Sequence, residues 1–125
     1  MSIETKVINI RVANIRPQYN NLKEWMKDNN NVYIGRCGVL VIDNVRFPKE
    51  NSIWANPYKI DDSNGITRNN VIEKYRTYII QKIENNDILK QKLLQMKGKT
   101  LGCWCKPLVC HGDVLVELIN KYSKE

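Results

Sequence analysis

The 125-residue chain lacks the features of a membrane protein and of a disulfide-stapled secreted protein. No apolar run approaches the ~20 residues that a membrane-spanning helix needs. Its first residues show no basic segment followed by an apolar core, so we expect no secretory signal. Four cysteines do not suggest a disulfide scaffold in a chain of this length. We therefore expect a cytoplasmic protein without membrane partners, whose thiols stay reduced.

The chain also lacks long runs of basic residues, internal repeats and low-complexity segments. Its net charge is nevertheless +7, which favours anionic partners such as nucleotides, phosphorylated metabolites or nucleic acid. Because the lysines are spread along the whole chain, charge alone does not single out nucleic acid. A hydrophobic fraction of 42% and a charged fraction of 26% are typical of a globular chain. The length predicts a single domain over residues 1–125.

Hydrophobic periodicity predicts a small α/β domain, in which helices flank a sheet and the chain closes with a strand, a loop and a helix. The expected strands cover residues 7–12, 32–36, 38–43 and 100–105, and residues 44–63 read as a loop. Four helices are expected. The first starts at Asn20 or Asn21, and the second runs from Thr67 to about Ile83. The third starts at a cap on Asp87, and the fourth follows residue 110. Met26 and Ile88 are expected on the inner faces of the first and third helices. In such sheets ligands bind at the carboxyl ends of the strands, where the closing strand meets its loop.

The segment from Gly102 to Leu115, GCWCKPLVCHGDVL, holds three of the four cysteines and the only histidine. Cys103, Cys105, Cys110 and His111 offer four ligands, the number that structural zinc requires. The first pair is C-x-C in an expected strand, where the two Cα atoms lie roughly 6.6 Å apart. The chain has no second C-x-x-C and no H-x-x-x-H pair. We therefore expect no metal or other cofactor, with a small structural zinc-binding domain as an alternative.

The second half of this segment favours a reactive or ligand-binding site. Cys110 directly precedes the last expected helix, and a helix N-terminus binds anions and lowers the pKa of a thiol. His111 titrates near neutrality and can act as an acid or a base. Gly112 lets a ligand approach the backbone closely. Asp113 is interpreted as a helix cap or first-turn carboxylate, and as a candidate catalytic group beside Cys110 and His111.

Three further residues are candidates for the wall of the site. Arg36 follows an expected strand and can hold a phosphate or a carboxylate with two hydrogen bonds. Trp54 and Asn56 combine an aromatic ring with an amide, the pair that a nucleobase pocket uses. Each residue also has a purely structural interpretation. Arg36 can be a solvent-facing charge, Trp54 a ring packed in the core, and Asn56 a turn residue. Packing in the core is the favoured interpretation for Cys103 and for Cys37.

Four segments in this order, YIGR, SIWANPYKI, EKYRTYI and GCWCKPLVCHGDVL, resemble the domain-of-unknown-function family numbered 4326. The resemblance covers about residues 7–122, and the closing pattern of Cys, Trp, Pro, His, Gly and Asp is its most specific part. Ala55 stands where the family often has glycine. The family has no established activity, so the resemblance implies no catalytic residue for this chain.

The leading hypothesis is an α/β domain that binds a nucleotide or another anionic metabolite at the start of the last helix. Cys110 is the candidate nucleophile, His111 the candidate acid or base, and Asp113 their neighbour. Gly112 and Cys105 are expected beside the ligand, together with Arg36, Trp54 and Asn56. Group transfer or hydrolysis is the reaction class if the site is catalytic. The alternatives are a non-catalytic nucleic-acid-binding module, a zinc domain and a plain interaction module.

Overall fold

The computed structural model describes residues 4–124, so the two ends of the predicted domain lie outside the described part. The central sheet has three parallel strands in the order β1-β5-β2. They are β1 (Lys6–Asn9), β5 (Thr100–Cys103) and β2 (Asn31–Tyr33). Asn9 lies opposite Cys103, and Tyr33 lies opposite Gly102. All three strands therefore end at the same edge of the sheet.

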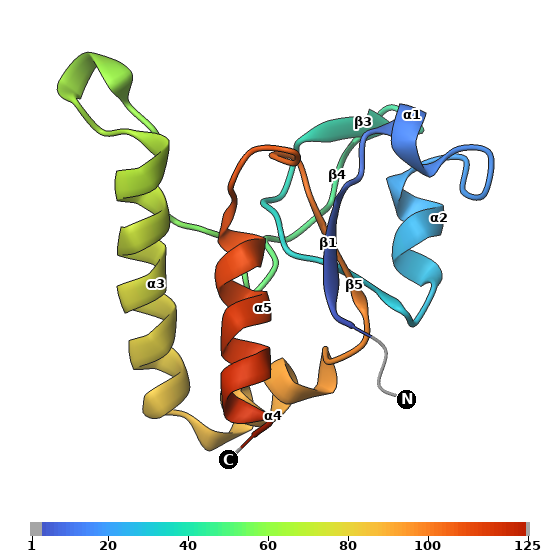
Figure 1. Ribbon diagram of the computed structural model, residues 1–125. Coiled ribbons are helices and arrows are strands. Elements are labelled where there is room, and N and C mark those ends of the chain that lie inside the picture. Colours follow the sequence, from blue (N-terminus) through green and yellow to red (C-terminus); the bar gives the residue numbers. More distant parts are fainter. Residues whose placement is uncertain (1–3, 125) are drawn as a thin grey trace.

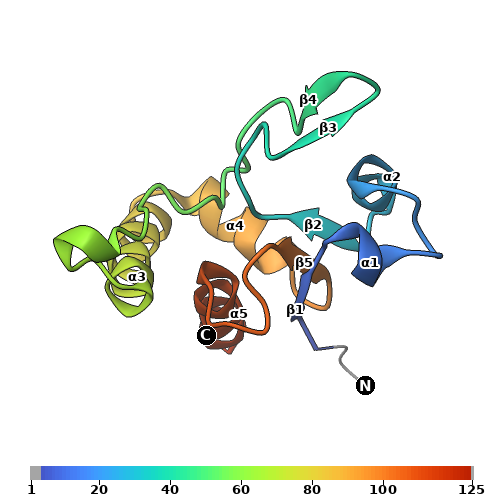
Figure 2. The ribbon, with the colours of Figure 1, turned by 90° about the horizontal axis from the view of Figure 1, so that it is seen from above.

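Helices cover both faces of this sheet, as Figures 1 and 2 show. One face carries α1 (Val12–Ile15) and α2 (Leu22–Lys27). The other face carries α3 (Arg68–Glu84), α4 (Asp87–Gln95) and α5 (His111–Tyr122). Successive residues of β5 enter different cores, since Leu101 and Cys103 pack with α3–α5 while Gly102 meets Trp25 of α2. The predicted α/β class is confirmed.

Local sequence explains where most of the helices begin. Asn21 caps α2 by accepting a hydrogen bond from the backbone N–H of Glu24. Thr67 caps α3 in a reciprocal arrangement with Asn70. The expected cap on Asp87 is wrong by one residue, because the side chain of Asn86 accepts from the N–H of Leu89 and Asp87 is already helical.

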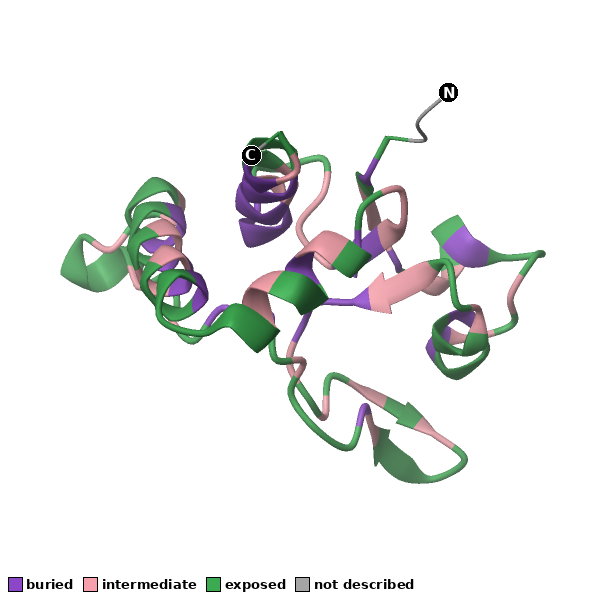
Figure 3. Ribbon diagram, turned by 90° about the horizontal axis from the view of Figure 1, so that it is seen from below, coloured by how far each residue is buried: buried purple, intermediate pink, exposed green. Residues whose placement is uncertain are grey.

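The expected third strand does not join the central sheet. Instead β3 (Leu40–Ile42) pairs with β4 (Val45–Phe47) in a separate antiparallel hairpin, and β4 lies in the segment that was expected to be a loop. Asp43 and Asn44, which connect the two strands, both have positive φ angles (54° and 65°). This conformation suits a two-residue hairpin turn and the residue types Asp and Asn. Figure 3 shows the hairpin projecting from the body with mostly exposed residues. A short 3₁₀ helix, η1 (Asp62–Asn64), follows before α3.

All four expected strands are too long, since the second ends at Tyr33 instead of residue 36 and the third covers only Leu40–Ile42. The first and the last are too long for a common reason. The alternation from Val7 to Val12 continues past Asn9, but β5 ends at Cys103 and offers no further partners, so Val12 begins α1. For the same reason the closing strand stops before Cys105. Two core positions are also wrong, since the side chains of Met26 and Ile88 are 37% and 67% exposed. Both helices are short, and their inner faces are already filled by Leu22, Trp25 and Leu93.

Candidate functional site

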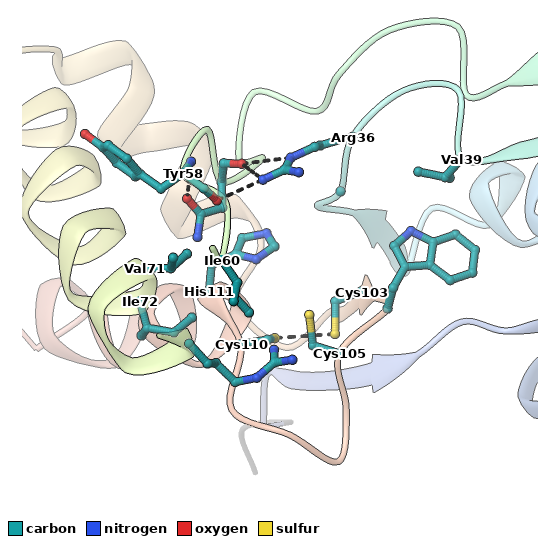
Figure 4. Close-up of a pocket in the computed structure, with 14 residues that line it drawn as sticks. Arg36, Val39, Tyr58, Ile60, Val71, Ile72, Cys103, Cys105, Cys110 and His111 are labelled. Atoms are coloured by element: carbon teal, nitrogen blue, oxygen red, sulfur yellow. Dashed lines mark hydrogen bonds between the residues drawn. The ribbon is translucent and has the colours of Figure 1, made fainter. Parts of the chain in front are cut away.

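A cavity of about 290 Å³ lies at the edge where the parallel strands end. Its walls come from segments that are far apart in the sequence, as Figure 4 shows. They are the turn after β2, the end of β5, the start of α5, the loop before η1 and the first turn of α3. The lining residues include Arg36, Asn56, Arg68, Cys103, Cys105, Cys110 and His111, with apolar walls from Val39, Ile60, Val71 and Ile72.

Three thiols lie on one wall of this cavity (Figure 4). The Sγ atoms of Cys110 and Cys103 are 3.4 Å apart, with Cys110 as the hydrogen-bond donor. Cys110 is also the N-cap of α5, and its sulfur accepts from the backbone N–H of Gly112 at 3.3 Å. Both side chains are buried, whereas Cys105 is partly exposed. The interpretation of Cys103 as a core residue is thus only part of its role, because it also faces the cavity.

The two contacting thiols differ in acidity. The Cys110 thiol donates to the sulfur of Cys103 and lowers the pKa of the Cys103 thiol, with help from the backbone N–H groups of Cys105 and Lys106. Burial opposes this shift. The same hydrogen bond and burial raise the pKa of Cys110. The nearby Asp113 carboxylate acts in the same direction on Cys110. The hydrogen bond between the two sulfurs favours the thiolate on Cys103, whereas the backbone N–H of Gly112 favours a thiolate on Cys110. The sequence analysis assigned the nucleophile to Cys110, and that role stays a prediction.

His111 is the first residue of α5, and its side chain is only 8% exposed. Its Nε2 lies 2.7 Å from the carbonyl oxygen of Ile34. Because a carbonyl can only accept, Nε2 carries the proton and Nδ1 keeps a lone pair. Burial lowers the pKa of His111, and the ring packs edge-on against Tyr75 at 5.0 Å between centroids. His111 is thus a neutral hydrogen-bond acceptor in the wall of the cavity.

Arg36 and Asn56 reach the cavity together. Arg36 donates from Nε and Nη2 to the carbonyl of Asn56, at 3.0 and 2.8 Å, and from Nη2 to that of Tyr58. Asn56 in turn accepts from the N–H of Tyr58 through its side-chain oxygen. Arg36 therefore fixes the loop that forms one wall of the cavity. Within residues 4–124, no hydrogen bond occupies its Nη1, which leaves two N–H groups for a ligand.

Three predicted site residues do not line the cavity and instead serve packing or helix capping. Trp54 is 4% exposed in the core and does not line the cavity, and its carbonyl accepts from the Tyr75 hydroxyl at 2.7 Å. Gly112 is needed for packing, because a Cβ atom there would lie 2.8 Å from Ile34 and 2.9 Å from Val7. Asp113 completes the cap of α5 by accepting from the backbone N–H of Cys110, and it pairs with Lys106 at 2.5 Å. Neither Gly112 nor Asp113 lines the cavity.

Arg68 is the main residue of this cavity that the sequence analysis missed. It is the first residue of α3 and lines the cavity, and its Nη1 donates to the carbonyl of Val109, in the loop before α5, at 3.4 Å. The positive charge of Arg68 therefore faces the same space as Arg36. No local pattern marks this residue, since the contact joins segments 41 positions apart.

Among residues 4–124, no group of three or more His, Cys, Asp or Glu side chains has the arrangement of a metal site. Within the same range, no helix is both long enough and apolar enough to cross a membrane.

The fold and the cavity together define a small three-layer α/β domain with a thiol-lined pocket at the ends of its strands. The chain belongs to the family described as a domain of unknown function, DUF4326, whose model matches residues 18–121.

The chain is similar to two uncharacterized viral proteins. One is an uncharacterized 12.4 kDa protein in the nrdA-td intergenic region of Enterobacteria phage T4, 36% identical over 59 residues, which are 47% of this chain. The chain covers 55% of the length of that phage protein. The other is a protein of Acanthamoeba polyphaga mimivirus, 34% identical over 113 residues, which cover 81% of this chain and 78% of the viral protein. No solved structure matches the chain.

Proposed function

We propose that the protein binds a small anionic ligand of the nucleotide class in the cavity at the strand ends. The observation that carries this proposal is that two arginines, Arg36 and Arg68, face one cavity that has apolar walls and a neutral histidine. The cations suit a phosphate, the apolar walls suit a base or a sugar face, and His111 can accept a hydrogen bond.

The volume of the cavity limits the size of the ligand that it can hold. Its volume of about 290 Å³ is at the lower end of the range for ligand sites, roughly 300–1,000 Å³. A mononucleotide or a phosphorylated sugar therefore suits it better than a dinucleotide. The net charge of +7 supports an anionic partner, and four free cysteines support the expectation of a reducing, cytoplasmic setting.

Group transfer or hydrolysis is the reaction class that the same cavity would support. In that case the Cys103 thiolate is the nucleophile, since the hydrogen bond from Cys110 favours its charged form. Asp113 would act indirectly, by holding the start of α5 and the Lys106 side chain. A Cys103→Ser variant would then keep ligand binding and lose turnover.

The binding proposal is tested by the change in melting temperature with a panel of nucleosides, nucleoside monophosphates and sugar phosphates. A ligand at 100 times its Kd stabilises the folded state by about 2.7 kcal/mol. We expect the phosphorylated compounds to raise the melting temperature and the free nucleosides to raise it less. Arg68→Gln should lose most of this gain. Arg46→Gln is the matched control, because Arg46 lies on the exposed hairpin and donates to the carbonyl of Gly38.

A contrary result would favour the nucleic-acid-binding alternative. If no member of the panel changes the melting temperature while an oligonucleotide binds with a steep dependence on salt, the surface charge and not the cavity is the ligand site. Arg46→Gln and Arg68→Gln would then weaken oligonucleotide binding to similar extents.

A further inference from the structure

Cys103 and Cys110 form a buried pair of thiols at the wall of the cavity. Their sulfur atoms are 3.4 Å apart, and a disulfide bond requires about 2.05 Å. The sulfurs therefore need to approach by little more than about 1 Å. Both residues also line the cavity, so a small molecule in it can reach the pair.

The two thiols differ in the way that thiol–disulfide exchange requires. Such exchange starts from a thiolate and ends with attack by a second thiol on the mixed disulfide. Cys103 receives the hydrogen bond from Cys110 and lies near the Lys106 ammonium, both of which favour its thiolate. Cys110 caps α5 and keeps its proton until Cys103 has reacted.

We propose that Cys103 and Cys110 are a redox-active dithiol that reduces small organic disulfides entering the cavity. The Cys103 thiolate attacks one sulfur of the substrate, forming a mixed disulfide and releasing the other half of the substrate as a thiolate. That thiolate takes the proton of Cys110. The Cys110 sulfur then attacks Cys103, which forms the intramolecular disulfide and releases the second half of the substrate as a thiolate. In sum, the Cys103 thiolate and the Cys110 thiol lose two electrons, and one substrate disulfide becomes one thiol and one thiolate, which takes a proton from water.

The size of the cavity selects the substrate class. A cavity of about 290 Å³ with buried sulfurs admits a low-molecular-weight disulfide and excludes a disulfide within a folded protein. Cys105 lines the same cavity and is partly exposed, so it is the competing thiol that an experiment must separate. This proposal does not depend on nucleotide binding, because it is argued from the hydrogen-bonded sulfur contact, the nearby Lys106 charge and access from the cavity.

The test uses hydroxyethyl disulfide, a small neutral probe, on the folded chain carrying Cys37→Ser. This substitution removes the one exposed thiol among the described residues. The reaction is quenched with acid, the chain is denatured and alkylated, and its intact mass is measured. We expect this chain to lose two hydrogens and two alkylatable thiols without retaining the probe. Adding Cys105→Ser should leave the result unchanged.

Two further variants in the Cys37→Ser background assign the order of attack. Cys110→Ala should stop at a stable mixed disulfide that carries half of the probe on Cys103. Cys103→Ala should form no intramolecular disulfide with Cys110 and should react at least tenfold more slowly at the cavity. Circular dichroism confirms that each variant is folded, and Cys→Ser replaces Cys→Ala where it is not.

The result in the Cys37→Ser chain is decisive by itself. If its three remaining thiols all stay alkylatable, or if Cys105→Ser abolishes the disulfide, the proposal is overturned. Because no nucleotide is present, a failure of the binding proposal leaves this measurement unaffected.

Discussion

The two faces of the central sheet are both tightly packed, but they enclose different side chains. On the α1–α2 face the buried cluster consists of Ile10, Ile15, Leu22, Trp25 and Tyr33. On the α3–α5 face the buried cluster includes Cys103 and Cys110 among its aliphatic residues, with His111 beside it. The first face contributes stability, whereas the second also places titratable groups at the wall of a cavity.

Each face brings a helix close to the sheet through a glycine. A Cβ atom on Gly102 would lie 2.5 Å from Trp25, and one on Gly112 would lie 2.8 Å from Ile34. The two glycines are thus alike in packing but differ in position. Gly112 directly follows the Cys110–His111 pair, so a shift there moves the cavity wall, whereas a Cβ atom on Gly102 meets Trp25 and Ile10 on the opposite face of the sheet. The comparison can therefore be tested by disturbing one face at a time.

The largest effect is expected from Trp25→Ala, which empties the centre of the α1–α2 face. Removing this fully buried ring should lower the free energy of unfolding by about 3–5 kcal/mol. Urea unfolding measures the loss. In the fraction that stays folded, the rate at which iodoacetamide alkylates Cys103 should match that of the wild type. A change in that rate would show that the two faces are coupled.

A smaller and paired effect is expected from Gly102→Ala and Gly112→Ala. Each should cost about 1–3 kcal/mol, because the added methyl group overlaps a packed side chain. Gly112→Ala should change the alkylation rate of Cys103 more than Gly102→Ala does, since displacing the start of α5 moves the Cys110 sulfur, whereas the methyl group on Gly102 points to the opposite face. Equal alkylation rates in the two variants would contradict the division of roles between the faces.

The smallest effect concerns pH and His111. Burial lowers the pKa of His111 in the folded chain below the ordinary value of 6.5, so the unfolded chain binds this proton more tightly. Its contribution to stability is therefore present above pH 6.5 and is lost as the pH falls toward the folded pKa. His111→Gln keeps a donor for the carbonyl of Ile34 and removes the titration. Between pH 5 and pH 8, the free energy of unfolding measured with urea should depend less on pH in this variant than in the wild type. An identical pH dependence would rule out His111 as its source.

Local signals in the sequence account for much of the fold. The helix expected from Thr67 to about Ile83 matches α3 within one residue at each end, and the last helix begins at His111 as expected. Strand lengths were overestimated, because a strand ends where its partner ends. The β3–β4 hairpin was missed, since nothing local shows whether a short apolar strand joins the main sheet or pairs with its neighbour.

The candidate site was predicted only in outline. Cys110, His111, Cys105, Arg36 and Asn56 do lie on one cavity, and their ligand-binding roles stay predictions. Trp54 was placed at the ligand because a ring and an amide are adjacent in the sequence, but its ring turns into the core. Arg68 was missed because its contact with the cavity depends on how α3 packs.

The sequence by itself determined the α/β class and the start of α5 at the cysteine-rich segment, because periodicity and local helix signals act over a few neighbouring residues. Only the tertiary structure brought the Cys103 and Cys110 sulfurs together, because the two residues lie on different elements. It also decided that Gly112 serves packing and that Arg68 faces the cavity. Those properties arise from contacts between β1, β2, α3 and α5, which no short stretch of the chain contains.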